Sequence, residues 1–389
     1  SWKVPCAVIK DSPKYPWRGF MLDSGRQYQT PEFIRRYLDF LAMLKINVFH
    51  WHLTEGQGWR IEIKRYPKLT EIGSKIADGA EQQGYYSQDE IREIVQYAKE
   101  RCITVVPEID VPGHSEAALI AYPELTCFGE KPQSVMEYSQ QLFCGGNEST
   151  YTFIENILDE VCKLFPGEYV HLGGDEAPKA NWNSCSKCQE KVRLEGLKNS
   201  HELQIYFSSR LANYLKQKGR KVILWGDVVE QEGPSLPEDV IIYWWNYRKN
   251  KTAAYDAALK SGRRIICGTN YYTYLNFPVT PWSKYREDRT FDLKKAYEEN
   301  PADIAHPPEL VMGMGACLWT DWNVTMNMID QRVFPRVYAL AQQMWSQSER
   351  RPFADFYKKV KAQYRRLEFL GIRVGPALRE EVPPGYRWE

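Results

Sequence analysis

Two adjacent carboxylic acids, Asp175 and Glu176, end the segment His171-Leu-Gly-Gly-Asp-Glu176. They follow a short apolar run and two glycines, and glycine lets the backbone come close to a ligand or to a neighbouring strand. Consecutive residues near the end of a strand point in different directions. The two acids are therefore poorly placed to face each other across a scissile bond, where an acid and a nucleophile stand ~5–9 Å apart. We expect them to perform two different tasks on one side of a ligand.

A histidine is predicted to lie near this pair. In Val106-Pro-Glu-Ile-Asp-Val-Pro-Gly-His114, Asp110 ends an apolar strand and the Pro-Gly step turns the chain, which brings His114 back over the strand end. A histidine in that place can orient and electrically tune a carboxylic acid. The structural alternative is a turn histidine that bonds only to a backbone carbonyl. A metal site is disfavoured, because His50 and His52 alternate on one strand and no compact set of ligands accompanies them.

The cysteines give the same expectation about metals. Cys185 and Cys188 form a C-x-x-C pair in a polar loop. A zinc site usually needs a second such pair, and none is evident in the sequence. Cys127 and Cys144 bracket another polar loop and could instead form a disulfide. We therefore expect neither a metal nor a cofactor.

Eight short apolar runs, most of them followed by a segment of helical periodicity, must position these residues. We predict strands at residues 19–22, 47–53, 103–109, 169–172, 222–225, 240–245, 264–267 and 314–319, and helices at 31–44, 88–101, 150–165, 201–218, 251–260 and 353–370. Apolar strands that alternate with helices indicate a parallel sheet buried on both faces. Eight such units favour an α/β fold of the closed (β/α)8 TIM-barrel type. The alternative, an open doubly wound sheet, normally has a glycine-rich phosphate turn after its first strand, which this chain lacks.

In such a barrel the active site is built at the carboxyl ends of the strands. Ionisable and tryptophan side chains recur at those ends, at Asp23, His52, Asp110, Asp175, Glu176, Trp225, Trp244, Trp245, Trp319 and Asp321. Packing explains any one of them, but their recurrence at one rim is harder to explain by packing. The rim is therefore the predicted functional site.

Composition narrows the class of ligand. The chain has 51 basic and 50 acidic residues, so nothing in its charge favours binding to nucleic acid or to an acidic membrane surface. No apolar run approaches the ~20 residues of a membrane-spanning helix. The 13 tryptophans fit a carbohydrate site, because an indole ring can stack on the apolar face of a sugar.

Six motifs resemble, in order, the catalytic domain of family 20 glycoside hydrolases, the β-N-acetylhexosaminidases: Arg18-Gly19, His52-Leu-Thr, Asp110-Val-Pro-Gly-His114, His171-Leu-Gly-Gly-Asp-Glu176, Tyr274-Leu275-Asn276 and Leu318-Trp-Thr-Asp321. The resemblance spans about residues 15–350. Members usually carry a smaller α/β domain before the barrel, and this chain begins too close to Arg18 to contain it. We therefore expect residues 1–389 to form a single catalytic barrel domain, with its core at about 15–350 and a final helix at 353–370.

The resemblance also implies residue roles. Such enzymes retain anomeric configuration without a protein nucleophile, because the substrate's own 2-acetamido oxygen attacks the anomeric carbon. Glu176 would be the general acid and then the base, and Asp175 would orient the acetamide and stabilise the oxazolinium cation. Tyr274 would donate to the acetamide oxygen, while His114 would support Glu176. The substrate-binding residues would be Arg18, Asp110, Trp225, Trp245, Asn276, Trp319 and Asp321. Neighbours on a strand face opposite sides, so only one of Trp244 and Trp245 can face the sugar, and Trp245 is chosen.

Three positions depart from the family's usual pattern. Glu55 stands where an aspartate is usual, in the place expected behind His114. Asn276 stands where the family often has aspartate, and Asp321 where it often has glutamate, near the sugar's 4- and 6-hydroxyl groups. These changes make that corner roomier and less repulsive to an anion.

The sequence thus predicts an exo-acting β-N-acetylhexosaminidase, whose partner is a glycan or glycoconjugate with terminal N-acetylglucosamine or N-acetylgalactosamine. One alternative is a family member specific for a 6-sulfated or otherwise substituted hexosamine, or one that releases a disaccharide. Another is a sugar-binding module without turnover. The resemblance implies a secreted, periplasmic or lysosome-like location, and no nucleic acid or membrane span is expected.

Overall fold

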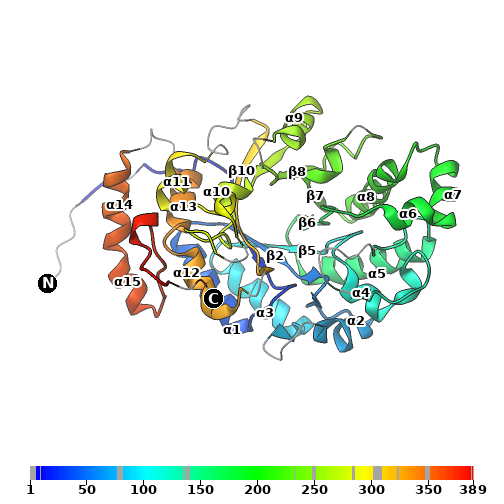
Figure 1. Cartoon of the computed structure of the whole chain (residues 1–389), viewed down its shortest axis with the longest axis horizontal. Coiled ribbons are helices and arrows are strands. Elements are labelled where there is room, and N and C mark those ends of the chain that lie inside the picture. Colours follow the sequence, from blue (N-terminus) through cyan, green and yellow to red (C-terminus); the bar gives the residue numbers. More distant parts are fainter. Residues whose placement is uncertain are drawn as a thin grey trace.

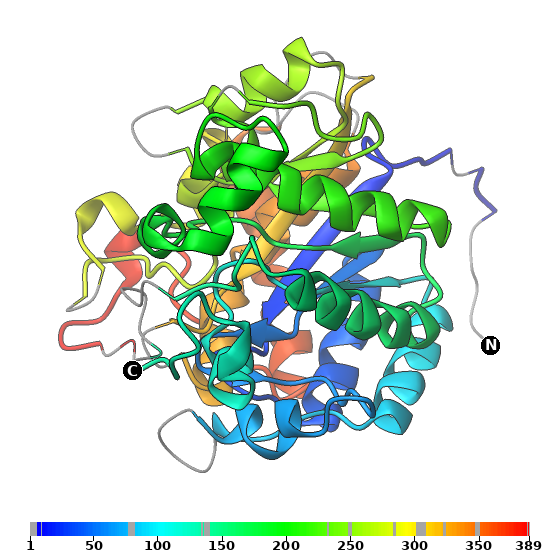
Figure 2. The same cartoon turned by 90° about the vertical axis from the view of Figure 1, so that its right-hand side faces the viewer.

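The computed structural model describes residues 6–8, 10–76, 82–133, 135, 141–231, 233–247, 251–282, 285–300, 309–321, 324–346, 351–386 and 388. Eight parallel strands close into a barrel in the order β1-β10-β9-β8-β7-β6-β5-β2 (Figures 1 and 2). They are β1 Trp17–Asp23, β2 Val48–His52, β5 Thr104–Glu108, β6 Tyr169–His171, β7 Lys221–Trp225, β8 Ile241–Trp244, β9 Ile265–Cys267 and β10 Val311–Leu318. Beyond β2, β3 (Thr54–Glu55) and β4 (Gly58–Trp59) form a short antiparallel hairpin. Each of the eight predicted strands corresponds to one barrel strand, so the TIM-barrel prediction is confirmed.

Helices surround the barrel. They are α1 Pro31–Met43, α2 Lys68–Glu71, α3 Gln88–Lys99, α4 Glu116–Ala121, α5 Glu148–Leu164, α6 Ala180–Ser184, α7 Ser186–Leu194, α8 Ser200–Gln217, α9 Ala253–Lys260, α10 Asn270–Thr273, α11 Leu293–Glu298, α12 Met326–Val333, α13 Val337–Trp345, α14 Phe353–Ala362 and α15 Tyr364–Phe369. The start of α1 is fixed by Thr30, whose side chain accepts a hydrogen bond from Phe33 N. The single helix predicted at 353–370 is instead a pair, α14 and α15, which meet at Gln363 and lie together at one end of the molecule (Figure 1).

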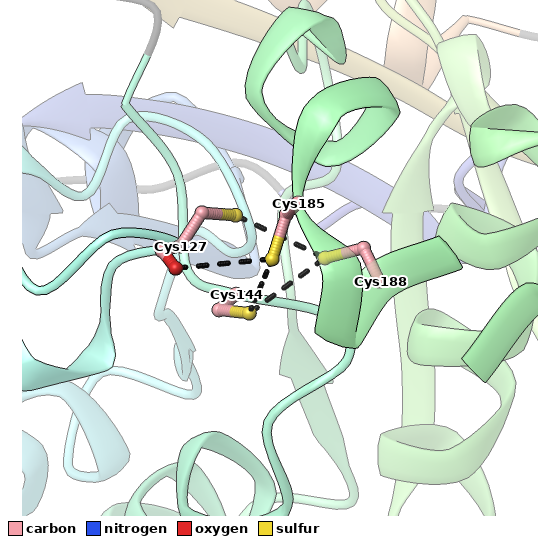
Figure 3. A group of neighbouring side chains, drawn as sticks. All are labelled: Cys127, Cys144, Cys185 and Cys188. Carbon is pink, nitrogen blue, oxygen red and sulfur yellow. Dashed lines mark hydrogen bonds between the residues drawn. The ribbon is translucent and has the colours of Figure 1, made fainter. Parts of the chain in front are cut away.

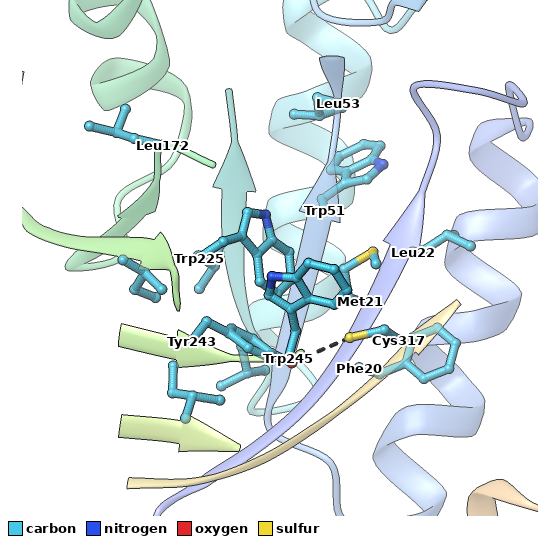
Figure 4. Close-up of a cluster of buried hydrophobic side chains, with 14 of the residues drawn as sticks. Phe20, Met21, Leu22, Trp51, Leu53, Leu172, Trp225, Tyr243, Trp245 and Cys317 are labelled. Carbon is cyan, nitrogen blue, oxygen red and sulfur yellow. Dashed lines mark hydrogen bonds between the residues drawn. The ribbon is translucent and has the colours of Figure 1, made fainter. Parts of the chain in front are cut away.

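The barrel interior is densely packed. Figure 4 shows side chains from β7, β8 and β10 meeting at its centre, where the Tyr243 hydroxyl lies 3.5 Å from Cys317 Sγ. A Cβ atom on Gly315 would come within 1.7 Å of the Tyr243 hydroxyl oxygen, so Gly315 makes room for that ring. Because the interior is filled to this degree, the strand ends are held at fixed positions. Within the described part of the chain, no helix is both long enough and apolar enough to cross a membrane.

Candidate active site

A pocket of about 420 Å³ opens at the carboxyl ends of the barrel strands. This volume falls within the range of ~300–1,000 Å³ common for small-molecule sites. Of the residues predicted from the sequence, the pocket is lined by His114, Asp175, Glu176, Trp225, Trp245, Tyr274, Asn276, Trp319 and Asp321. The closed barrel thus brings together residues that lie far apart in the chain.

The acidic pair follows β6 through a tight turn. Gly173 and Gly174 have φ values of +64° and +96°, a backbone region that suits glycine. A Cβ atom on Gly173 would come within 1.7 Å of an Asp110 side-chain oxygen, so this position has no space for a side chain. Glu176 itself has a φ of +45°, a strained backbone conformation for a residue with a side chain. The turn therefore brings both neighbouring acids to the pocket.

The two acids differ in their contact with solvent. The side chain of Asp175 is 12% exposed, whereas that of Glu176 is 54% exposed. Asp175 therefore lies deep in the pocket, and Glu176 lies where a leaving group or a water molecule can reach it. This difference agrees with the prediction that the two acids perform different tasks.

His114 lies beside both acids. Its Nε2 atom is 3.6 Å from Asp175 Oδ2 and 3.8 Å from Glu176 Oε2. Its Nδ1 atom is 2.8 Å from Glu55 Oε1, the contact that the sequence predicted for Glu55. Arg26 Nη2 lies 3.1 Å from the other Glu55 oxygen. Positive and negative groups thus alternate from Arg26 through Glu55 and His114 to the acidic pair.

The neighbouring charges determine the protonation states of Glu55 and His114. Burial alone would lower the pKa of His114, but the negative charges of Glu55 and Asp175 outweigh it and hold that pKa well above its ordinary value. Burial would raise the pKa of Glu55, but the charges of Arg26 and His114 outweigh it and hold that pKa well below its ordinary range. At neutral pH His114 is therefore an imidazolium that faces the two catalytic candidates.

Below the pocket, three histidines surround one carboxylate. Glu108 lies 2.7 Å from His52 Nδ1, 2.8 Å from His50 Nε2 and 3.3 Å from His171 Nδ1, and it accepts a hydrogen bond of 2.7 Å from Trp225 Nε1. The expectation that no ligand-type residues accompany His50 and His52 is therefore wrong. Their neighbours come from β5 and β6, and sequence spacing does not show which strands lie side by side. The barrel interior itself supplies four polar neighbours for this carboxylate.

Aromatic rings wall the pocket. The rings of Trp245 and Tyr274 are nearly parallel, at an interplanar angle of 13° and a centroid distance of 6.2 Å. Trp319 lies 6.0 Å from Tyr274 and 5.8 Å from Trp225, measured between ring centroids. Trp244, by contrast, packs against Tyr247 and Tyr255 and does not line the pocket. The choice of Trp245 as the pocket residue agrees with this placement.

The corner near Asn276 and Asp321 differs in detail from the expectation. Asn276 Nδ2 donates to Asp321 Oδ1 at 2.9 Å, and the Tyr285 hydroxyl donates to the same oxygen at 2.8 Å. Asn276 Nδ2 also donates to the Tyr285 hydroxyl oxygen at 3.4 Å, so both N–H groups of the amide have partners within the protein. Arg289, which the sequence analysis did not select, lines this pocket. The pocket thus has two arginines among its lining residues, Arg26 and Arg289.

The structure corrects the placement of Arg18. This residue lies at the start of β1, the opposite end of the barrel from the pocket, where its guanidinium donates to the carbonyl oxygens of Lys45 and Tyr15. Arg26, three residues beyond the end of the same strand, lines the pocket instead. Its guanidinium lies 5.2 Å from the Trp319 ring centroid and 3.0 Å from Asp23 Oδ2. Its position after a strand end was a signal that could have identified it.

Asp110 is a second correction. It is buried beneath the pocket and is not among the lining residues; its Oδ1 atom accepts a hydrogen bond from Gly174 N at 3.0 Å. Burial and the negative charge of Asp175 both raise the pKa of Asp110 well above its ordinary value. Asp110 therefore holds the glycine turn from beneath the pocket.

Asp227, which the sequence analysis missed, contacts both the acidic turn and the aromatic wall. It follows β7 by two residues, the same signal that identified the other rim carboxylates. Its oxygens accept hydrogen bonds from Glu176 N at 3.2 Å and from Trp245 Nε1 at 2.5 Å. Burial first, and the charge of Asp175 second, raise the pKa of Asp227 to about 7.

This raised pKa predicts a pH-dependent cost in stability. An aspartate whose pKa is about 7 in the folded chain and 3.8 ordinarily binds its proton more tightly when folded. Its contribution to folding is therefore fully present below about pH 4 and is lost as the pH rises to about 7. Asp227→Asn removes this titration. Between about pH 5 and pH 8, the free energy of unfolding of the variant should therefore increase relative to that of the parent. Urea unfolding at both pH values measures this difference.

A surface substitution provides the control for that experiment. Asp239→Asn removes a carboxylate beside Lys216, away from the pocket. Loss of a hydrogen bond at Asp227 costs about 1 kcal/mol at every pH and does not change the slope. A difference between parent and Asp227→Asn that stays constant with pH would contradict the raised pKa.

The fold and the site define the class of the protein. A closed barrel with an acidic pair and a wall of tryptophans at its rim is the arrangement of a glycoside hydrolase barrel. Residues 15–348 match the family described as glycosyl hydrolase family 20, catalytic domain. The chain belongs to this family, as the sequence motifs predicted.

Individual relatives agree with this assignment. A β-hexosaminidase of Porphyromonas gingivalis is 39% identical over an alignment that covers 97% of this chain and 49% of that protein. The solved structure of a β-N-acetylhexosaminidase from Bacteroides fragilis is 54% identical with a TM-score of 0.93 and covers 97% of this chain and 76% of that one. A family 20 exo-β-N-acetylglucosaminidase from Vibrio harveyi, solved in complex with N-acetylglucosamine, is 30% identical with a TM-score of 0.83, over 94% of this chain and 60% of that one. The chain thus spans about half the length of the P. gingivalis relative.

Proposed function

We propose that this chain is an exo-acting, retaining β-N-acetylhexosaminidase that removes terminal β-linked N-acetylglucosamine or N-acetylgalactosamine. The observation that carries the proposal is the pair of adjacent acids with unequal exposure in one aromatic pocket. Adjacent residues cannot flank a glycosidic bond as acid and nucleophile, so the pair suits a reaction in which the substrate supplies the nucleophile. The names of the P. gingivalis and B. fragilis relatives support the same activity.

In the first step, Glu176 gives its proton to the glycosidic oxygen as the bond to the anomeric carbon breaks. The carbonyl oxygen of the 2-acetamido group forms the new bond to that carbon, which gives a cyclic oxazolinium ion. In the second step, the Glu176 carboxylate takes a proton from water as the water oxygen attacks the same carbon, and the bond from that carbon to the acetamide oxygen breaks, which restores the acetamide group. The 54% exposure of its side chain supports both roles, because leaving group and water must each reach it.

Asp175 and Tyr274 are proposed to manage the acetamide group. The sheltered carboxylate of Asp175 accepts the acetamide N–H and opposes the positive charge of the oxazolinium ion, which develops only as the bond breaks. The Tyr274 hydroxyl donates to the acetamide oxygen and so orients it for attack. His114, held by Glu55, keeps a positive charge beside the two acids. Trp225, Trp245 and Trp319 stack against the sugar and exclude water.

Hydrolysis of aryl glycosides tests this function. The purified chain is expected to release the aryl group from N-acetyl-β-glucosaminide and from N-acetyl-β-galactosaminide, and not from β-glucoside, which lacks the acetamide. Nuclear magnetic resonance of the first product should detect the β-anomer, since the mechanism retains configuration. Tight sugar binding without turnover of any N-acetylhexosaminide would overturn the proposal in favour of a binding module.

Arg289 favours a second candidate substrate, hexosamine with a sulfate at the 6-position. Arg289 lines the same pocket as Asn276 and Asp321, and Asp321 is already engaged by Asn276 and Tyr285. A guanidinium matches the geometry and charge of an anion such as sulfate. The experiment compares kcat/KM for aryl 6-sulfo-N-acetylglucosaminide and its plain parent.

Two variants decide whether Arg289 has this role. Arg289→Gln should lower kcat/KM for the sulfated substrate by about tenfold or more relative to the plain one, as expected for loss of a charge-assisted hydrogen bond of ~1.5–3 kcal/mol. Arg286→Gln, three residues earlier on the exposed side of the same turn, should change neither. Equal losses on both substrates, or no turnover of the sulfated one, would remove this candidate.

A location outside the cytoplasm is proposed together with this function, because glycans that end in β-linked N-acetylhexosamine are the substrate class it requires. The relatives from P. gingivalis and B. fragilis are bacterial proteins, which fits an extracellular or periplasmic enzyme. Fractionation of cells that express the full-length native gene, followed by an activity assay on each fraction, tests this location.

A further inference from the structure

Four cysteines, distant in sequence, converge outside the pocket. Cys127 and Cys144 lie in the segment that follows α4, Cys185 lies at the junction of α6 and α7, and Cys188 lies in α7. All four are buried, and their sulfur atoms all lie within 4.8 Å of one another. Figure 3 shows the sulfur atoms of separate segments turned toward one another. Cys127 and Cys144, which the sequence offered only as a disulfide pair, therefore lie beside Cys185 and Cys188 and supply the second pair of a four-cysteine group.

We propose that these four cysteines bind one zinc ion as a structural tetrathiolate site. Thiolates bind zinc tetrahedrally at ~2.3 Å, which places neighbouring sulfur atoms about 3.8 Å apart. The sulfur–sulfur distances are 3.8 Å for Cys127 and Cys188, 3.8 Å for Cys144 and Cys185, and 3.6 Å for Cys144 and Cys188. Cys144 thus has two sulfur neighbours at the tetrahedral spacing, whereas a disulfide would single out one partner. The set matches the four-cysteine type of structural zinc site.

The local backbone is built for this convergence. Cys185 is the N-cap of α7 and Cys188 is its third residue, so both sulfur atoms lie near the positive end of a helix dipole, which stabilises thiolates. Gly145 and Gly146 follow Cys144 and lie against the segment that contains Cys185 and Cys188. A Cβ atom on Gly146 would come within 2.2 Å of the Lys187 carbonyl carbon. Side chains at these glycines would therefore push the Cys144 segment away from the segment of Cys185 and Cys188.

The site links two segments of the catalytic rim. The segment that contains Cys144 also follows β5 and the His114 turn, and Phe143 N donates to Pro112 O in that turn at 3.1 Å. The segment that contains Cys185 follows β6 and the acidic pair, and Trp182 Nε1 donates to Phe143 O at 2.9 Å. Zinc would hold these two segments together without contacting the substrate. We assign the ion a structural role, and catalysis proceeds without it as a reactant.

Metal and thiol analysis of the purified chain tests the proposal. Protein prepared without chelator is expected to hold about one zinc ion per chain by inductively coupled plasma mass spectrometry. The four thiols should resist a thiol reagent until the chain is unfolded in the presence of chelator. A purified chain with free thiols and no zinc, one with iron in place of zinc, or one with disulfides among these cysteines by mass spectrometry would each overturn the assignment.

A matched pair of variants locates the ion. Cys188→Ser should lower the zinc content to well below one per chain and lower the melting temperature. Cys162→Ser removes a partly buried thiol of α5 outside the cluster and should keep the zinc and the melting temperature of the parent. Equal zinc content in both variants would contradict a site at these cysteines.

Cobalt replacement keeps the proposal testable if Cys188→Ser does not fold. The parent chain, unfolded with chelator and reductant and then refolded with cobalt, should show thiolate-to-cobalt charge-transfer absorption and the visible bands of tetrahedral cobalt. Refolding the Cys162→Ser variant in the same way should give the same spectrum. A refolded parent without these bands would overturn the tetrathiolate assignment.

Discussion

Glu176→Gln is expected to lower kcat for an unactivated N-acetylhexosaminide by at least the ~10²–10⁴-fold that general acid–base catalysis contributes. Glutamine has nearly the same size and cannot deliver a proton to the glycosidic oxygen. Because the Glu176 side chain is 54% exposed, the substitution removes little packing, and the fold should persist. Steady-state kinetics and a melting curve, measured on the same preparation, separate the two effects.

The leaving group distinguishes loss of the acid from general damage. A substrate with a very acidic phenol as leaving group needs little protonation, so its kcat should fall much less than that of a poor leaving group. Glu190→Gln serves as the control and should change neither rate. Glu190 is an exposed carboxylate on α7, and among the described residues its ion-pair partner is Arg193. An equal loss with good and poor leaving groups would argue against Glu176 as the acid.

Asp175→Asn is expected to lower kcat by roughly 10²–10³-fold, the range for removing one group that stabilises charge formed only in the transition state. The variant keeps the size of the side chain and loses the negative charge that opposes the oxazolinium ion. Since this charge is absent from the bound substrate, the loss should appear mainly in kcat, with a smaller change in KM. Kinetics on the same aryl N-acetyl-β-glucosaminide measure both parameters.

A stable mimic of the intermediate tests the partner of Asp175 directly. A thiazoline analogue of the oxazoline should inhibit the parent strongly and Asp175→Asn weakly. The Glu176→Gln variant, which lacks only the proton donor, should bind the same mimic more nearly like the parent. If Asp175→Asn binds the thiazoline as tightly as the parent, the acetamide has another partner.

The sequence was sufficient for the barrel and for the residues nearest the strand ends. Each of the eight strands could be located because a buried parallel strand is apolar throughout, and strand ends in a barrel meet at one rim. Asp175 and Glu176 were selected from their place at a strand end and Tyr274 through the family motifs, and all three line the pocket. Glu55 was expected behind His114, and its carboxylate contacts that histidine.

Contacts across the barrel were harder to predict. Arg18 was chosen within the correct motif, but it lies at the start of β1, and Arg26 at the other end of the strand reaches the pocket. Asp110 was expected at the ligand, but its side chain turns under the glycines of the next strand. Local patterns specify which residues belong to a strand, but direction and depth depend on neighbours that are distant in sequence. For the same reason, the sequence does not show that Cys127 and Cys144 lie beside Cys185 and Cys188.

The unequal exposure of the two acids has a consequence for the supply of protons. After each proposed turnover the acid must be protonated again, and a buried acid would need a chain of donors that leads to the surface. Glu176, with 54% of its side chain exposed, can exchange its proton with bulk water directly. The buried row of Arg26, Glu55 and His114 then has no proton to deliver, and its fixed charges can stay unchanged through the whole cycle.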